Sequence, residues 1–287
     1  MKKLSNQQYI DIFEVMVNDL ASYLRRYNLK SMVLGISGGI DSTLVAAICS
    51  EVVNRNPEFR FIGVSLPCST NSEEENSSAM STMNAFCKDG FYWTQNLQDV
   101  YEHVEKVYDN SFVPTLVSTG NLKARLRMMY LYNLAGNFKG IVMDTDNLTE
   151  HYLGFFTLHG DQGDYMPIGC LWKHEVYELT KALYDSYYTD EVQKEALHRA
   201  LTITPTDGNG VLAGGDMAQI APGHTYEEVD DILATYLSTA QKQSLYDKYG
   251  KETVDRVIAR HVGSAFKRNN DFVGTNREDM PCIGSIY

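Results

Sequence analysis

A strand-like run that ends in two adjacent glycines and a helical pattern is the feature that most constrains the fold. Residues 31–36 are a continuous apolar run typical of a buried parallel strand, and residues 42–53 have a helical pattern. Between them lies Ser37-Gly38-Gly39-Ile40-Asp41. Paired glycines let the backbone approach an anion closely, and the following helix directs its free N–H groups toward that anion. A phosphate-binding strand–loop–helix unit is therefore predicted from Gly35 to Ser42.

A simpler interpretation of this loop is a Gly-rich turn capped by Ser37 or Asp41. The phosphate-binding interpretation is preferred because the strand, the Gly-Gly pair, the carboxylate and the helix occur together. The loop is shorter than a Walker motif and lacks its lysine, which disfavours a kinase or GTPase. A carboxylate at Asp41, beside an anion, is explained if Mg²⁺ bridges the two.

Strand and helix patterns alternate along the chain. Further strands are predicted at 59–66, 92–94 and 140–143, and helices at 8–26, 72–86, 97–108, 119–134, 176–183, 191–200, 226–237 and 253–262. Asn71 or Ser72 is the expected cap of the second of these helices, with Glu75 as its capping-box partner. We predict an α/β fold: a mostly parallel sheet with helices on both faces and helical N- and C-terminal extensions. Residues 1–287 are expected to form one domain, with a core at about 30–185 and a helical part with substrate loops at about 186–287.

Composition excludes several classes of protein. The 287 residues have a net charge of −12 and no cluster of Lys and Arg, which disfavours nucleic-acid binding. No run approaches the roughly 20 apolar residues that span a bilayer, and no leader peptide is evident, so no membrane association is expected. Five cysteines without a Cys-x-x-Cys pair indicate buried thiols in a reducing compartment, so we expect a cytoplasmic protein. The seven histidines have no metal-ligand spacing.

Several segments resemble known enzymes. Ser37-Gly38-Gly39-Ile40-Asp41-Ser42 resembles the loop of the N-type ATP pyrophosphatases, which split ATP between its α- and β-phosphates. The run from Gly120 to Met128, GNLKARLRM, resembles a helix of the NAD synthetases, and so do DTDNLTE at 144–150, GFFTLHGDQGD at 154–164 and the lysine that follows PIGCLW. Pro205-Thr206-Asp207 and Ala265-Phe266-Lys267-Arg268 continue the series in the same order. The resemblance is to ammonia-dependent NAD synthetases, and it covers about residues 10 to 270.

The resemblance implies an adenine nucleotide alpha hydrolase-like, Rossmann-like fold and a set of site residues. ATP contacts are implied for Gly35, Ile36, Ser37, Gly38, Gly39, Ile40, Asp41, Ser42, Thr145, Lys173 and Thr206. Substrate contacts are implied for Asn121, Arg125, Asp164 and Lys267, and magnesium ligands for Asp41 and Glu150. Lys173 is expected to stabilise charge at the α-phosphorus, and Asp161 to orient or deprotonate ammonium.

The implied activity is ATP-dependent amidation of deamido-NAD by ammonia through an acyl-adenylate, giving NAD, AMP and pyrophosphate. Free ammonia is expected because no length remains for a glutaminase domain, and a homodimer is implied by the resemblance. Leu158, Phe266 and Asp144 replace the Lys, His and Gly of the family pattern. Two alternatives stay open: an N-type pyrophosphatase with another acceptor, and a non-catalytic ATP-binding paralogue. The retained Asp41, Glu150 and Lys173 disfavour the paralogue.

Overall fold

The computed structural model describes residues 3–87, 91–107, 113–204, 215–269 and 277–281. Its strands are β1 (Ser31–Gly35), β2 (Arg60–Ser65), β3 (Tyr92–Thr94) and β4 (Gly140–Val142). Its α-helices are α1 (Asn6–Arg26), α2 (Ile40–Arg55), α3 (Glu73–Phe86), α4 (Gln98–Val107), α5 (Leu116–Asn137), α6 (Leu148–Leu153), α7 (Lys173–Ser186), α8 (Glu191–Thr202), α9 (Gly215–Ile220), α10 (Tyr226–Thr239), α11 (Gln243–Tyr249) and α12 (Lys251–Gly263). Two 3₁₀ turns follow, η1 (Ala265–Asn269) and η2 (Arg277–Asp279).

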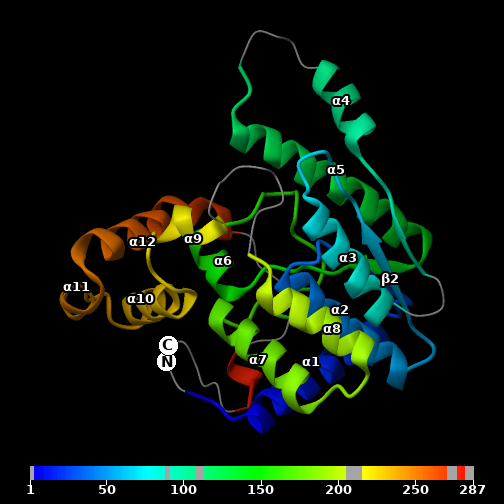
Figure 1. Ribbon diagram of the computed structural model, residues 1–287, viewed down its shortest axis with the longest axis horizontal. Helices are drawn as coiled ribbons and strands as arrows, with labels where there is room; N and C mark the ends of the chain where they lie inside the picture. Colours follow the sequence, from blue (N-terminus) through cyan, green and yellow to red (C-terminus); the bar gives the residue numbers. More distant parts are fainter. Residues whose placement is uncertain (1–2, 88–90, 108–112, 205–214, 270–276, 282–287) are drawn as a thin grey trace.

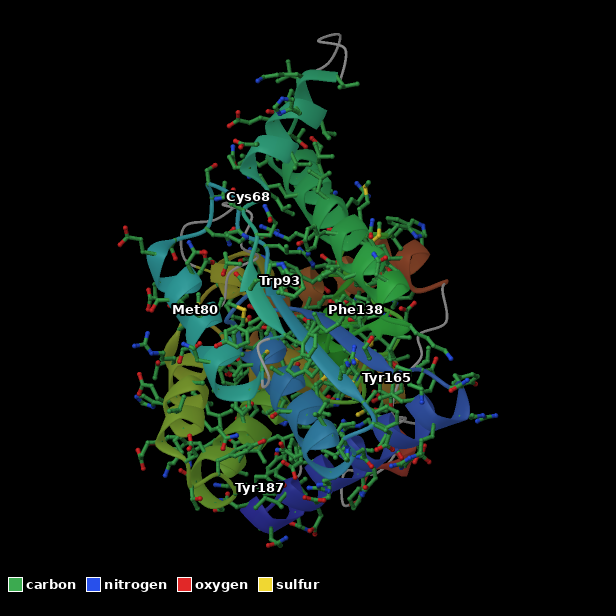
Figure 2. All side chains as sticks on the ribbon, turned by 90° about the vertical axis from the view of Figure 1, so that its right-hand side faces the viewer. Cys68, Met80, Trp93, Phe138, Tyr165 and Tyr187 are labelled. Atoms are coloured by element: carbon green, nitrogen blue, oxygen red, sulfur yellow. The ribbon has the colours of Figure 1, made fainter. Side chains whose placement is uncertain are left out.

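The four strands form one parallel sheet in the order β3-β2-β1-β4. Successive residues of β1 point to opposite faces of this sheet. Met32 and Leu34 join a cluster with apolar residues of α1, α2 and α7, whereas Val33 packs with residues of α5. Figure 2 shows the strands between α3, which carries Met80, and α5. The predicted parallel sheet with helices on both faces is confirmed.

The helix ends follow their capping residues. Ser72 accepts a hydrogen bond from the backbone of Glu75, whose side chain accepts one from the backbone of Ser72, so the predicted cap of α3 is confirmed. Helix α5 begins three residues before the predicted start because Thr115 and Ser118 form a similar reciprocal pair. The longer helix places its first turn at the rim of the site described below.

The C-terminal helices form their own apolar cluster beside the sheet-containing core. Residues of α10, α11 and α12 pack against Leu148 and Leu153 of α6 and against Trp172, which precedes α7. Figure 1 shows α10, α11 and α12 as one group to the side of α6 and α7. Trp172 therefore connects the helical part to the start of α7. The division of the chain near residue 185 stays a prediction.

The buried-thiol prediction holds for four of the five cysteines. Cys49, Cys68, Cys87 and Cys170 are free and buried, and Cys282 lies outside the described residues. Within the described part of the chain, each helix is too short or too polar to span a bilayer.

Candidate functional site

The loop between β1 and α2 has the shape that its glycines predict. Gly38 has a φ of +82°, and its carbonyl accepts a hydrogen bond of 2.7 Å from the Ser78 hydroxyl. A Cβ atom at Gly38 would lie 2.3 Å from the Ala79 nitrogen, so only glycine lets the loop lie this close to α3. The backbone N–H of Gly39 donates to the Ser37 hydroxyl, which also contacts the Ser42 hydroxyl at 3.0 Å.

The N-terminus of α2 faces a cavity of about 420 Å³ at the carboxyl ends of the strands. Gly39 occupies the N-cap position and supplies no side-chain cap, which leaves first-turn amides of α2 for an anionic ligand. The predicted site residues that line the cavity are Gly35, Ile36, Ser37, Gly39, Ile40, Asp41, Ser42, Asn121, Thr145, Glu150, Asp161, Lys173 and Lys267. Gly38, Arg125 and Asp164 are not among its lining residues, and Thr206 lies outside the described residues.

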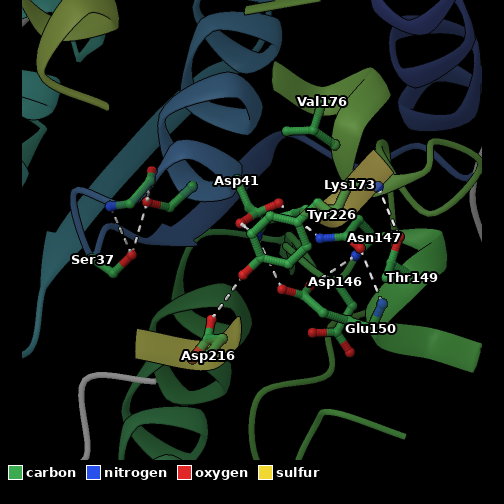
Figure 3. A network of polar contacts seen from close by, with 12 residues as sticks. Ser37, Asp41, Asp146, Asn147, Thr149, Glu150, Lys173, Val176, Asp216 and Tyr226 are labelled. Carbon is green, nitrogen blue, oxygen red and sulfur yellow. Dashed lines mark hydrogen bonds and ion pairs between the residues drawn. The ribbon is translucent and has the colours of Figure 1, made fainter. Parts of the chain in front are cut away.

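A buried ammonium group joins the two carboxylates that were predicted to bind a metal. Lys173 Nζ forms a short contact with Asp41 Oδ2 and lies 3.1 Å from Glu150 Oε1, with the Lys173 side chain 3% exposed. Asn147 Nδ2 donates to the other Asp41 oxygen at 2.9 Å, and its own side chain caps α6, which carries Glu150. Figure 3 shows these side chains converging from α2, α6 and α7. Three chain segments therefore build one charged centre.

The charges at this centre perturb one another. Burial raises the pKa of Glu150 above its usual value, whereas the nearby Lys173 ammonium favours its charged form. Burial alone lowers the pKa of Lys173, but the Asp41 and Glu150 carboxylates outweigh it, so the net pKa lies well above its usual value. Lys173 is therefore a cation at neutral pH. Two carboxylates around one cation form a donor set that suits a hard divalent ion such as Mg²⁺.

A second pair of acidic residues, Asp144 and Asp146, lies near this centre, and Asp146 lines the cavity. Asp144 is buried and accepts hydrogen bonds of 2.7 Å from the backbones of Asp146 and Gly163. Burial raises the pKa of Asp144 to about 7 and that of Asp146 well above its usual value. Asp146 Oδ2 is buried without a hydrogen-bond partner among the described residues. Asp144, at a position where the family pattern has glycine, thus fastens the loop that follows β4.

Asp161 is exposed to the cavity and accepts a hydrogen bond of 2.6 Å from the Thr157 backbone. Desolvation by the surrounding protein atoms raises its pKa to about 6, despite hydrogen bonds that favour the carboxylate. A carboxylate with this pKa can accept a proton near neutral pH. Asp161 and Glu150 line the same cavity.

Three residues predicted to contact the substrate form hydrogen bonds with the loop at 154–161. Lys267 Nζ donates to the carbonyls of Gly154 and Phe156, and Asn121 Oδ1 accepts from Thr157 Oγ1 at 2.7 Å. Arg125 is exposed and donates to the Leu158 carbonyl at 3.2 Å. The structure brings Asn121 and Lys267 to the cavity and leaves Arg125 behind the loop.

Asp164 is bonded to β4 and α5 and does not line the cavity. Its carboxylate accepts hydrogen bonds from the Val142 backbone at 2.9 Å and from the Tyr132 hydroxyl at 3.1 Å. Phe266, which replaces the expected His, is 63% exposed. Of the departures from the family pattern, Phe266 is therefore on the surface, whereas Asp144 lies next to Asp146 near the charged centre.

Sequence reasoning missed the contribution of the C-terminal helices. The Tyr226 ring, from α10, lies 5.5 Å from Lys173 Nζ, and its hydroxyl donates to Asp216 of α9 at 3.5 Å. Figure 3 shows Tyr226 next to Asp41. Neither residue belongs to a local motif. The only available signal was their place in a predicted helix and a Gly-rich segment.

Known proteins resemble this chain in sequence and fold over most of its length. The family model described as NAD synthase matches residues 12–271. An NH(3)-dependent NAD(+) synthetase from Carboxydothermus hydrogenoformans is 32% identical over 233 residues, which are 79% of this chain and 86% of that protein. Among solved structures, NMN synthetase from Francisella tularensis has a TM-score of 0.74 at 28% identity, covering 94% of this chain and 99% of that one. An NH3-dependent NAD synthetase from Campylobacter jejuni has a TM-score of 0.70 at 25% identity, covering 92% and 98%.

Proposed function

The chain belongs to the NAD synthase family, and from that membership we propose that it amidates deamido-NAD with ammonia at the expense of ATP. The products are NAD, AMP and pyrophosphate, and the enzyme is a ligase that forms a C–N bond. One observation carries the proposal: Asp41, Glu150 and Lys173 meet beside the uncapped N-terminus of α2. An anion site next to two carboxylates and a buried lysine suits ATP cleavage at the α-phosphorus.

The loop from Gly35 to Ser42 binds the ATP phosphates through its backbone amides and the α2 dipole. Thr145 lines the same cavity and is assigned an ATP contact, as is Thr206 from its sequence motif. Lys173 lies at the first residue of α7, with its ammonium group held at the cavity. A fixed positive charge there stabilises the negative charge that develops on the α-phosphate in the transition state.

Asp41 and Glu150 are the residues that would hold Mg²⁺. Their fit is supported by their chemistry, since both are carboxylates and already share a cation in the Lys173 ammonium. When bound, the ion supplies neutralisation of phosphate charge. The Lys173 ammonium would then contact phosphate oxygens.

Adenylation proceeds when the nicotinate carboxylate of deamido-NAD attacks the α-phosphorus, releasing pyrophosphate. Ammonia then attacks the acyl carbon, and AMP leaves as the C–N bond forms. Asp161 orients the ammonium ion and accepts its proton, a role supported by its raised pKa of about 6 and its place in the cavity. Asn121, Arg125, Asp164 and Lys267 are assigned to the acceptor, of which Asn121 and Lys267 already line the cavity.

We propose that the enzyme is a homodimer located in the cytoplasm. The free cysteines Cys49, Cys68, Cys87 and Cys170 suit a reducing compartment. On α5, Leu116, Val117 and Met129 are 63–64% exposed, and Val117 also lines the cavity. The homodimer is assigned from the resemblance of the sequence motifs to ammonia-dependent NAD synthetases. A second subunit over α5 would cover one rim of the acceptor site.

The test is a product assay with ATP, Mg²⁺, ammonium and deamido-NAD. We expect NAD, AMP and pyrophosphate in equal amounts, and loss of all three in Asp41→Asn, which keeps the size of the side chain but removes its charge. Asp185→Asn, at the far end of α7, is the control that should leave the yield unchanged. Because a structural neighbour is an NMN synthetase, a parallel reaction contains nicotinate mononucleotide. NMN without NAD would refute the dinucleotide as acceptor.

A further inference from the structure

Side chains from two other helices hold the first turn of α7, where Lys173 lies. The backbone N–H of Lys173 donates to Thr149 Oγ1 at 2.8 Å, and that of His174 donates to Asp230 Oδ2 at 2.9 Å. Trp172, the N-cap residue, offers no acceptor because an indole only donates. Two of the free amides of this helix end are therefore satisfied by side chains of α6 and α10.

Asp230 is the centre of this network. Its side chain is fully buried in α10, and one oxygen accepts a hydrogen bond of 2.5 Å from Thr149 Oγ1. The other oxygen accepts from both the backbone and Nδ1 of His174, the latter at 2.8 Å. A buried carboxylate with three donors holds its neighbours in a fixed geometry, since losing any donor leaves a desolvated charge under-satisfied.

The Thr149 hydroxyl links this network to the reaction centre. It donates to Asp230 and accepts from Lys173, and Thr149 directly precedes Glu150, the partner of the Lys173 ammonium. The Thr149 hydroxyl thus bonds to the Lys173 backbone, and Thr149 itself lies next to Glu150, which contacts the Lys173 ammonium. Both ends of the lysine side chain therefore depend on the position of Thr149. Figure 3 shows the contact between Thr149 and the Lys173 backbone beside Glu150.

We propose that Asp230, acting through Thr149 and His174, is a positioning residue that aims the Lys173 ammonium at the phosphates of bound ATP. The inference rests on the proposed function, because it assigns Lys173 to ATP cleavage. It also gives the C-terminal helices a role in catalysis, since α10 contributes the carboxylate. Misplacing a catalytic group by about 1 Å can lower the rate by up to roughly 100-fold.

The test compares three threonine variants. Thr149→Val removes the hydroxyl without changing the size of the side chain, Thr149→Ser keeps it, and Thr180→Val is the matched control. Thr180 is also fully buried, and within the described part of the chain its hydroxyl bonds only to the Val176 carbonyl of α7. We expect Thr149→Val to slow ATP–pyrophosphate exchange roughly tenfold, with the KM for acceptor within about twofold. Thr149→Ser and Thr180→Val should stay near the unmodified rate.

Reductive methylation followed by mass spectrometry measures how readily the Lys173 amine reacts, and it does not require the enzyme to turn over. Its modification rate should rise several-fold in Thr149→Val and in Asp230→Asn, and not in Thr180→Val. Equal exchange rates and equal methylation in the two valine variants would overturn the inference. So would a loss in Thr149→Ser as large as that in Thr149→Val. A third outcome separates the two proposals. If the unmodified protein shows no ATP–pyrophosphate exchange, but Lys173 is still methylated more slowly in it than in Thr149→Val, the proposed function is refuted and the positioning role stands.

Discussion

Replacing Gly38 by alanine should deform the phosphate loop, whereas the same change at Gly39 should not. At Gly38 the φ of +82° costs an ordinary residue about 1–2 kcal/mol. The new Cβ atom would also lie 2.3 Å from the Ala79 nitrogen and 2.7 Å from the Ser78 carbonyl carbon, both backbone atoms of α3. Moving a helix to relieve such contacts costs about 1–3 kcal/mol. We therefore expect Gly38→Ala to lower the free energy of unfolding by about 2–5 kcal/mol.

Gly39 is the matched control because its backbone suits any residue. Its φ and ψ are −73° and 166°, and among the residues that the structure describes, a Cβ atom there would meet only Ser37 Oγ, at 3.4 Å. Alanine is a poorer N-cap than glycine, so the expected cost is at most about 1 kcal/mol. Thermal unfolding followed by circular dichroism should show Gly38→Ala melting about 5–15 °C below the unmodified protein. Equal destabilisation by the two substitutions would refute the argument from φ and close packing.

Three further predictions concern charge. Lys173→Met should slow ATP–pyrophosphate exchange by at least about 100-fold, whereas Lys181→Met, farther along α7 and exposed, should leave it unchanged. Because the pKa of Asp161 is about 6, kcat at saturating ammonium should fall as the pH drops below 6. If Asp161→Asn shows the same fall in kcat, this carboxylate is not the group whose protonation causes it. Burial raises the pKa of Asp144 from about 3.9 in the unfolded chain to about 7 in the folded protein. Between these values the folded state binds more protons, so the free energy of unfolding falls as the pH rises. Urea unfolding should show a smaller difference in this free energy between pH 5 and pH 7 for Asp144→Asn than for the unmodified protein, and an unchanged difference would contradict the assignment.

The ATP loop could be predicted from the sequence because its determinants are local. Gly38 and Gly39, the strand before them and the helix after them lie within one strand–loop–helix unit, and the cap of α3 at Ser72 needs only the next three residues. Such features depend on backbone conformation and neighbouring side chains, which the order of residues encodes directly. The parallel sheet followed from the alternation of these units.

The network around Lys173 could not be predicted by the same reasoning. Lys173 and Asp41 are 132 positions apart, and Thr149 and Asp230 are 81 apart, so both contacts depend on how α6, α7 and α10 pack. Motif resemblance identified Lys173, Asp41 and Glu150 but carried no information on Asp230 or Tyr226. Helices α6, α9 and α11 were missed because six or seven residues are less than two helical turns, too short to show a period of 3.6.

Transfer of oxygen from the acceptor carboxylate to AMP tests the proposed chemistry most directly. Deamido-NAD labelled with ¹⁸O in its nicotinate carboxylate is incubated with the protein, ATP, Mg²⁺ and ammonium, and the products are analysed by mass spectrometry. Attack on the α-phosphorus places one label in the AMP phosphoryl group for every NAD formed. Label in inorganic phosphate, with ADP as the nucleotide product, would mean attack on the γ-phosphorus and would contradict the role assigned to the loop, Lys173 and Asp41.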